Sequence, residues 1–416
     1  MDVLVLGAGA REHALCWKLK QDGGVGRLYA APGNPGMATL ATLLPLDASD
    51  GAAVVAACRA HGISFVVVGP EAPLVAGVAD ALRTAGVGVF GPSAAAARLE
   101  GSKAFTKEIL QAAGVPTAAW RAFTEPREAE AYAHGVGACV IKADGLAAGK
   151  GVVVASDGEE AAAGVWTCAG LGSAGSTLIV EERLEGEEVS VMALCDGERY
   201  ALLPTARDHK RVGDGDTGPN TGGMGAVCPA GSLDASALDA VGRDVIAPTL
   251  AEMRRRGTPF QGVLYAGLML TAAGPKVLEF NCRLGDPEAQ VILLSLDEPL
   301  LPLLVACAEG GLAARPLRVK HEVAVGVVAA AAGYPASPRT DDVIGGLEQV
   351  PPGVRVFHAG TRRSGDVLVT SGGRVLTVCA QGLDVADARA RAYAGLAAVN
   401  FEGMHARRDI GLEPVR

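Results

Sequence analysis

The chain has 416 residues, 49% of them hydrophobic and 20% charged, which is an ordinary balance for a globular protein of roughly two to four domains. Its formal net charge of −9 repels nucleic-acid backbones, so we expect no nucleic-acid partner. The nine cysteines form no CxxC pair, which argues against a zinc site or a disulfide framework and favours a reducing cytoplasm, and no apolar run is long enough to span a membrane.

Residues 1–101 alternate short apolar runs with helical patterns, which predicts an N-terminal domain with a parallel sheet. The first run indicates a β-strand rather than a signal peptide. Gly- and Pro-rich turns follow the predicted strands at 7–12, 31–36 and 69–71. Because parallel strands end at one sheet edge, we expect these turns to lie together where ligands bind.

The opening turn, residues 7–12, leads from a strand into a helix, so its backbone N–H groups can hold a phosphate. It is not a complete dinucleotide fingerprint, because Glu12 stands where the third glycine belongs. An oxidoreductase that binds a dinucleotide is therefore disfavoured. A tight turn without a ligand is the other interpretation.

Residues 102–319 are the predicted central domain, with a small α+β lobe at about 120–190 that includes strands at 139–142, 152–155, 178–181 and 189–193. The Gly-rich loop 142–151 carries two lysines and is typical of a hairpin that folds over a triphosphate. It is not a Walker A loop, since no Ser or Thr follows Lys150. A surface hairpin with solvated lysines is the alternative.

Two further segments of the central domain are polar in unusual ways. The acidic segment 179–190 can offer groups to adenine and ribose, although an acidic run is usually a solvated turn. Residues 208–225 begin with Asp208, His209, Lys210 and Arg211 and continue with Gly, Asp and Asn, a composition that cannot pack a core. The basic start favours an ordered loop for an anionic substrate over a disordered loop.

The strand 277–283 places Glu279, Asn281 and Arg283 on one face, because side chains alternate along a strand. A carboxylate and an amide oxygen at this spacing suit Mg²⁺, and Arg283 can clamp a phosphoryl or carboxylate oxygen. An exposed polar strand face is the alternative. A helix should follow, with Asp286 as N-cap and Pro287 at its first position.

Residues 320–416 form the last predicted unit, a small C-terminal α/β domain. Its strands are expected at 323–328, 354–358 and 374–380, and a long Ala-rich helix is expected from 385. The overall fold class is therefore α/β and α+β with several domains.

Over nearly its whole length the chain resembles the phosphoribosylamine–glycine ligases of the ATP-grasp superfamily. The resemblance is carried by the motifs at 7–14, 31–34, 68–74, 99–107, 141–152, 208–225, 279–283 and 356–361. It implies two ATP-grasp lobes that close on ATP. It also implies ligation of glycine to 5-phosphoribosylamine, giving glycinamide ribonucleotide, ADP and phosphate through a glycyl phosphate, in de novo purine biosynthesis.

The resemblance also implies roles for individual residues. Arg283, Asp208 and Lys210 are the expected catalytic residues, and Mg²⁺ or Mn²⁺ is expected at Glu279 and Asn281. The preceding strand, which in many ATP-grasp enzymes supplies another metal carboxylate, has none at 265–268. The expected ATP contacts are Lys103, Lys142, Gly145, Gly149, Lys150, Gly151, Glu181, Glu182, Leu184 and Glu188. The expected substrate contacts are Gly9, Asn34, Gly69, Pro70, Glu71, Arg211, Asn220, Gly222, Gly223 and Gly225.

We expect the N-terminal turns and the 208–225 loop to face each other across one cleft, with Arg283 at its floor. Asp208 would then fix the amine or the ribose hydroxyls, and Lys210 or Arg211 would neutralise phosphate charge. The expected partners are small molecules only, without a membrane, and the expected state is a cytoplasmic monomer or weak dimer. Another ATP-grasp carboxylate–amine ligase is the main alternative, and a non-catalytic binding module would leave the lysine hairpin unexplained.

Overall fold

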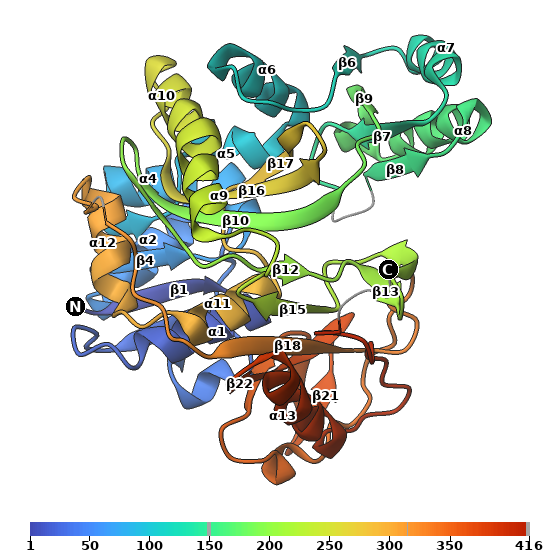
Figure 1. The fold of residues 1–416 in the computed structure, drawn as a ribbon. Coiled ribbons are helices and arrows are strands. Elements are labelled where there is room, and N and C mark those ends of the chain that lie inside the picture. The colour runs from blue at the N-terminus through green and yellow to red at the C-terminus, as the bar shows by residue number, and fades with distance from the viewer. Residues whose placement is uncertain (148–150, 314, 413–416) are drawn as a thin grey trace.

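The computed structural model describes residues 1–147, 151–313 and 315–412, and it confirms the predicted fold class of several α/β and α+β units (Figure 1). The N-terminal unit is a five-stranded parallel sheet in the order β3-β2-β1-β4-β5. Its elements are β1 (Val3–Gly7), α1 (Ala10–Leu19), β2 (Leu28–Pro32), β3 (Thr42–Leu43), α2 (Gly51–His61), β4 (Phe65–Val68), α3 (Glu71–Val75), α4 (Val78–Thr84), β5 (Gly88–Phe90) and α5 (Ala94–Gly101). Strands β1 and β4 are buried along their whole length, which explains their unbroken apolar sequences.

The small lobe is a four-stranded antiparallel sheet, in the order β6-β9-β7-β8, and Figure 1 shows it projecting from the rest of the molecule. Its elements are β6 (Trp120–Phe123), α7 (Pro126–Val136), β7 (Cys139–Ala143), β8 (Val152–Ala155), α8 (Gly158–Ala169) and β9 (Leu178–Glu182). Our assignment of the strand at 189–193 to this lobe was wrong. That strand is part of β10, which pairs with β16 of the larger sheet through ten residues.

The larger central sheet has the order β11-β10-β16-β17 and carries the predicted metal strand at its edge. Its elements and the central helices are α6 (Lys103–Ala113), β10 (Glu187–Asp196), β11 (Tyr200–Leu202), α9 (Ala235–Val241), α10 (Ala247–Arg255), β16 (Gln261–Thr271), β17 (Gly274–Asn281), α11 (Glu288–Ser295) and α12 (Leu300–Glu309). Helix α6 ends at Ala113, because Gly114 takes a left-handed conformation with φ of 68°.

The C-terminal sheet has the order β12-β15-β18-β22-β19 and differs from our expectation in its first two strands. Strands β12 and β15 come from the 208–225 region, which we assigned to the central lobe, yet β15 pairs with β18 and β12 with β15. The elements of this unit are β12 (Arg207–Asp208), β13 (Arg211–Gly213), β14 (Thr217–Asn220), β15 (Gly225–Cys228), β18 (Val323–Ala330), β19 (Arg355–His358), β20 (Thr361–Ser364), β21 (Val367–Thr370), β22 (Arg374–Gly382) and α13 (Val385–Ala398). Sequence order is a poor guide here, since strand pairing joins segments about a hundred residues apart.

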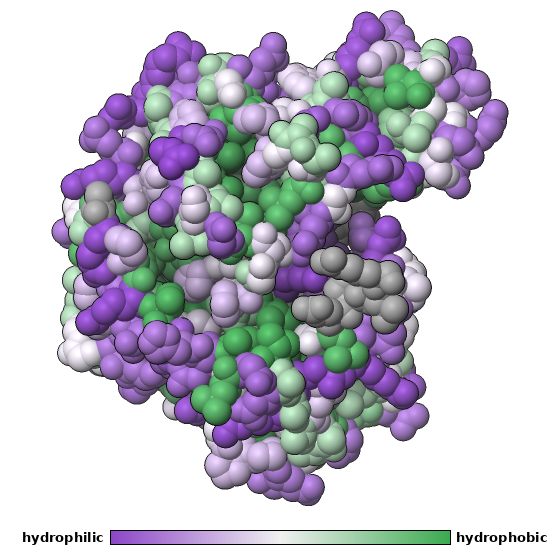
Figure 2. Space-filling view, in the orientation of Figure 1, coloured by the Kyte–Doolittle hydropathy of each residue, from purple (hydrophilic) through white to green (hydrophobic). Residues whose placement is uncertain are grey.

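Polar side chains cover most of the face seen in Figure 2, with apolar residues scattered between them. None of the helices in the described ranges combines the length and the hydropathy that a membrane span requires. All nine cysteines are free and buried, as expected for a chain without a disulfide framework.

Candidate active site

Three lysines from separate elements surround Glu279 on β17. Lys103 begins α6, Lys142 lies on β7 of the small lobe, and Lys210 follows β12. Burial by itself raises the pKa of Glu279, but Lys210, Lys142 and Lys103 outweigh it and hold the pKa below its ordinary value. Glu279 is therefore an ionised carboxylate inside a group of cations, an arrangement that suits a polyphosphate with a divalent ion.

The oxygen ligands available for such an ion are few. Asn281 follows Glu279 on the same face of β17, and its Oδ1 accepts a hydrogen bond of 3.4 Å from Arg283 Nη2. Within the described part of the chain, no group of three or more His, Cys, Asp or Glu side chains is arranged to hold a metal. A divalent ion would thus depend on Glu279, Asn281 and oxygens of the substrates, which fits the preference of Mg²⁺ for keeping phosphates in its shell.

Glu181, which we expected to contact ATP, is 3% exposed and joins two lysines of the nucleotide region. Its carboxylate lies 3.1 Å from Lys142 Nζ and 3.0 Å from Lys107 Nζ. Lys142 Nζ also donates to the carbonyl of Leu278 at 3.1 Å, which links the small lobe to β17. Burial lowers the pKa of Lys107 to about 8. Glu181 therefore holds Lys142 in place.

The other expected ATP contacts surround the segment that connects β9 to β10. Glu182 pairs with Lys276 at 3.3 Å, Glu188 pairs with Lys210 at 3.0 Å, and Leu184 between them is half-buried. Lys103 Nζ donates to the carbonyl of Gly145 at 3.3 Å. Gly151 is buried immediately before β8, and Gly149 and Lys150 lie outside the described residues.

Arg283, which we expected on the strand, lies two residues beyond the end of β17 at Asn281, and its role as a clamp for a phosphoryl or carboxylate oxygen stays a prediction. Its Nη2 lies 3.0 Å from Glu100 Oε1 and its Nε lies 3.4 Å from Glu71 Oε2. Burial by itself lowers the pKa of Arg283, but Glu100 and Glu71 outweigh it and raise the pKa. Glu71, an expected substrate contact beside Pro70, therefore connects the N-terminal domain to the segment that follows β17.

Asp208 lies in a second polar cluster, which the sequence reasoning found only in part. Its Oδ1 is buried and contacts no hydrogen-bond partner in the described ranges, and burial together with Glu288 raises the pKa of its carboxyl well above the ordinary value. Glu288 is 3% exposed and accepts a hydrogen bond of 3.2 Å from Ser190, which also contacts Tyr265 at 2.7 Å. The sequence showed Glu288 only as part of a helix start, although it follows the metal motif directly.

The start of that helix also differs from our prediction. The N-cap of α11 is Pro287, one residue later than expected, and Asp286 stands outside the helix. The Asp286 carboxylate accepts a hydrogen bond of 2.7 Å from Gln290 and lies 3.2 Å from Arg374 Nη2. Asp286 thus pairs with a cation of the C-terminal domain instead of capping the helix.

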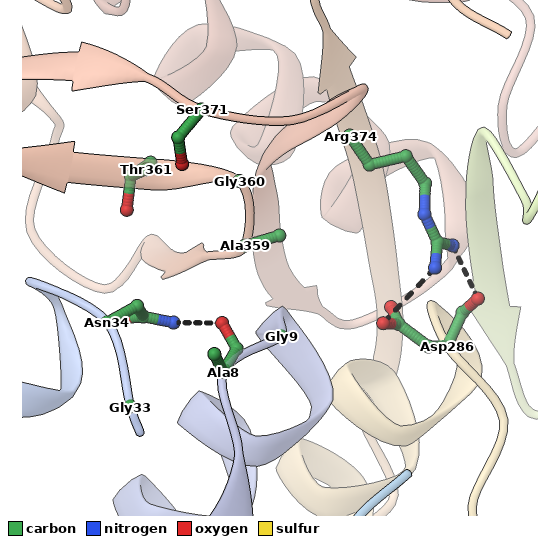
Figure 3. Close-up of a pocket in the computed structure, with 10 residues that line it drawn as sticks. All are labelled: Ala8, Gly9, Gly33, Asn34, Asp286, Ala359, Gly360, Thr361, Ser371 and Arg374. Atoms are coloured by element: carbon green, nitrogen blue, oxygen red, sulfur yellow. Dashed lines mark hydrogen bonds and ion pairs between the residues drawn. The ribbon is translucent and has the colours of Figure 1, made fainter. Parts of the chain in front are cut away.

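A pocket of about 480 Å³ lies between the N-terminal turns and the C-terminal domain (Figure 3). Figure 3 shows the Asp286–Arg374 pair on one side and the hydroxyls of Thr361 and Ser371 on another. Arg374 Nη1 also donates to the carbonyl of Gly222 at 2.5 Å, so the pocket adjoins the 208–225 loop. The lining residues are Ala8, Gly9, Gly33, Asn34, Asp286, Ala359, Gly360, Thr361, Ser371 and Arg374.

Of the N-terminal residues expected to bind substrate, Gly9 and Asn34 line this pocket. The N–H of Gly9, which we expected to hold a phosphate, donates to Glu12 Oε2 at 2.7 Å instead. A side chain at Gly69 would collide with the same Glu12 carboxylate, so Glu12 uses space that a third glycine would leave open. Asn34 is 4% exposed, and its amide donates to the carbonyls of Ala8 and His358, each at 2.8 Å.

The remaining residues of the 208–225 loop separate into two groups. Gly222 and Gly223 lie beside the pocket, where Gly223 packs against Asp208 and Pro287. Arg211 and Asn220 pair with each other in the β13–β14 hairpin, and Gly225 packs inside the C-terminal sheet. Lys210, half-buried beside Glu188, is the basic residue of this loop that reaches the group around Glu279.

A contact between the N-terminal and C-terminal domains predicts that the stability of the fold depends on pH. His13, 7% exposed, accepts a hydrogen bond of 2.8 Å from the backbone N–H of His358, and burial lowers the pKa of His13 to about 3. The unfolded chain binds the proton near pH 6.5 and the folded chain does not, so stability is lost as the pH falls below that value. We expect His13 alone to lower the free energy of unfolding by about 2 kcal/mol between about pH 7 and about pH 5. Urea unfolding of the unaltered chain and of His13→Gln at both pH values would measure this difference, and an identical pH dependence in both would contradict it.

Comparison with known proteins finds one family of relatives that match this chain over its whole length. Three family models of phosphoribosylglycinamide synthetase match the chain: the N domain at residues 1–100, the ATP-grasp (A) domain at 101–289 and the C domain at 324–413. The chain is 51% identical over 419 residues to the phosphoribosylamine–glycine ligase of Mesorhizobium japonicum, covering 100% of this chain and 99% of the relative. It is 53% identical over 416 residues to that of Streptomyces coelicolor, covering 99% and 98%.

Solved structures give the same result for the fold. The phosphoribosylamine–glycine ligase of Thermotoga maritima superposes with a TM-score of 0.86 at 33% identity, over 99% of this chain and 100% of that one. The biotin carboxylase domain of a Hydrogenobacter thermophilus 2-oxoglutarate carboxylase has a TM-score of 0.75 at 18% identity, over 97% and 91%. The second likeness concerns the fold alone.

Proposed function

We infer the function from family membership: the chain belongs to the phosphoribosylglycinamide synthetase family and is an ATP-grasp ligase that joins glycine to phosphoribosylamine in purine biosynthesis. The observation that carries the site assignment is the ionised Glu279 among Lys103, Lys142 and Lys210. Glu279 comes from the central sheet, and the lysines come from α6, the small lobe and the 208–225 loop, so ATP bound there would contact all of these segments.

We propose that the reaction runs through glycyl phosphate. A carboxylate resists attack by an amine, so a glycine carboxylate oxygen first takes the γ-phosphoryl group of ATP and releases ADP. The amine of phosphoribosylamine then attacks the acyl carbon, the C–O bond to phosphate breaks, and the amide forms with loss of one proton. Asp208, whose buried oxygen has no described partner and whose pKa is raised, is placed to hold an amine or to exchange a proton with it.

Lys142 and Lys103 are proposed to hold the phosphate oxygens of ATP, with Lys210 nearer the second substrate. Glu279 and Asn281 would hold Mg²⁺ or Mn²⁺, which supplies positive charge to the phosphates. Glu279 stays ionised in this environment, so it can serve as such a ligand without first losing a proton. Fixed positive groups around the transferred phosphoryl are the expected source of catalysis, because they need no rearrangement during the reaction.

The pocket lined by Arg374, Thr361 and Ser371 is proposed to take the ribose phosphate. Arg374 can donate to phosphate oxygens, the two hydroxyls can add hydrogen bonds, and Asp286 can accept from the ribose. The acidic chain and its free cysteines support a cytoplasmic enzyme with small-molecule substrates. We propose a monomer or weak dimer.

The products test this mechanism. We expect ADP and phosphate to form only when glycine, ATP and phosphoribosylamine are all present, with one ADP for each amide, because the phosphoryl group passes to glycine. Chromatography of the nucleotides, with phosphoribosylamine generated in place, would measure this ratio. Release of AMP and pyrophosphate would rule out the acyl phosphate.

A further inference from the structure

Residues 405–409, near the C-terminal end of the chain, bind the β13–β14 hairpin of the 208–225 loop through a buried arginine. Arg407 is 1% exposed, and its Nη1 donates to the carbonyl of Arg211 at 3.1 Å and to Asp216 Oδ1 at 2.6 Å. Its Nε and Nη2 donate to the two carboxylate oxygens of Asp409 at 2.8 and 2.6 Å. The guanidinium thus contacts the hairpin at Arg211 and Asp216, while its bidentate pair with Asp409 of its own segment fixes its orientation.

The same segment also contacts the turn of the hairpin directly. Asp409 Oδ2 accepts from the backbone N–H of Gly215 at 2.8 Å, and Asp214 Oδ1 accepts from the N–H of Arg408 at 2.7 Å. His405 Nε2 lies 2.8 Å from the carbonyl of Val212. Asp216 has a φ of 53°, a conformation that residues other than glycine rarely adopt, and its ion pair with Arg407 helps to hold it there. An isolated two-stranded hairpin would have little stability without such contacts.

The hairpin directly continues the chain from Lys210. Its first residue, Arg211, supplies the carbonyl that Arg407 binds. Thr221, just after the hairpin, donates its N–H and its hydroxyl to the carbonyl of Lys210 at 2.7 and 2.8 Å. Movement of the hairpin would therefore move Lys210, whose ammonium lies 3.0 Å from Glu188 and faces Glu279.

We propose that Arg407 is a positioning residue for the ligase reaction: it holds the β13–β14 hairpin so that Lys210 stays in the active site. This inference rests on the proposed function. Arg407 touches no substrate in this scheme, and its effect reaches the reaction through the backbone of Arg211 and Lys210. A displacement of about 1 Å in a group near the reacting atoms can lower a rate about 100-fold.

The test measures ADP formation with each substrate varied in turn, for Arg407→Gln and for Asp216→Asn. Asp216 is 52% exposed, and asparagine tolerates its backbone conformation, so this second variant removes the ion pair without burying an unpaired charge. We expect a drop between about 10-fold and about 100-fold in kcat/KM for phosphoribosylamine, with the KM for ATP nearly unchanged. Arg391→Gln is the matched control, because Arg391 is an exposed arginine of the same domain.

A double-mutant cycle separates positioning from general weakening of the fold. If Arg407 acts through Lys210, Arg407→Gln should lower the rate little further in a Lys210→Ala background. Fully additive losses, or unchanged kinetics in Asp216→Asn and a folded Arg407→Gln, would overturn the role of Arg407. If the unaltered chain forms no ADP with glycine and phosphoribosylamine, the proposed function fails and this inference falls with it.

Discussion

Replacing Glu279 with glutamine is expected to lower turnover by about 100-fold to about 1000-fold, the usual loss when one well-placed charged group is removed from a transition state. Glu279 is surrounded by Lys210, Lys142 and Lys103, which keep its pKa low and its carboxylate ionised. Glutamine keeps the shape and one oxygen but removes the negative charge. The concentration of Mg²⁺ or Mn²⁺ needed for half-maximal rate should therefore rise.

Steady-state ADP formation across a metal titration would measure both effects, and circular dichroism would show whether the variant is folded. Glu128→Gln is the matched control, since Glu128 is exposed on α7 of the small lobe. A folded Glu279→Gln variant with the turnover and metal dependence of the unaltered chain would refute this ligand assignment. If the Glu279→Gln variant does not fold, Glu279 has a structural role instead.

Replacing Lys210 with alanine is expected to raise the KM for phosphoribosylamine far more than the KM for ATP. Lys210 is partly exposed, so alanine there leaves no large cavity. Burial by itself lowers its pKa, but Tyr265, Glu188 and Glu279 outweigh burial and raise the pKa, so the ammonium is charged. A hydrogen bond to a charged group contributes about 1.5–3 kcal/mol, equivalent to about 10-fold to about 150-fold in kcat/KM.

Initial rates with one substrate varied at a time would show which constant changes. Lys20→Ala, an exposed lysine of the N-terminal domain, is the control. A rise in the KM for ATP with that for phosphoribosylamine unchanged would move Lys210 to the nucleotide. Such a result would also require Arg407 to act on ATP binding, because Arg407 is connected to the reaction through Lys210.

Local patterns in the sequence were sufficient wherever neighbouring residues decide the structure. The unbroken apolar runs of β1 and β4 predicted buried parallel strands, because such strands are covered on both faces. The alternation predicted Glu279 and Asn281 on the same face, and both follow a bulge at Leu278 that interrupts the pairing of β17 with β16. The roles of these residues in ATP and metal binding stay predictions from the motif and the family.

Only the tertiary structure decided which distant groups share the site. Arg374 lies 152 residues from Gly222 and Arg407 lies 191 residues from Asp216, yet both pairs are in contact. Neither arginine belongs to a local pattern. Both contacts form because strand pairing brings β12 and β15, and with them the 208–225 region, to the C-terminal domain. The same holds for Glu181, whose partners Lys107 and Lys142 meet it only after folding, while its contact with ATP stays a prediction. Spacing along the chain determines which side chains share a face, and the pairing of distant strands determines what they meet.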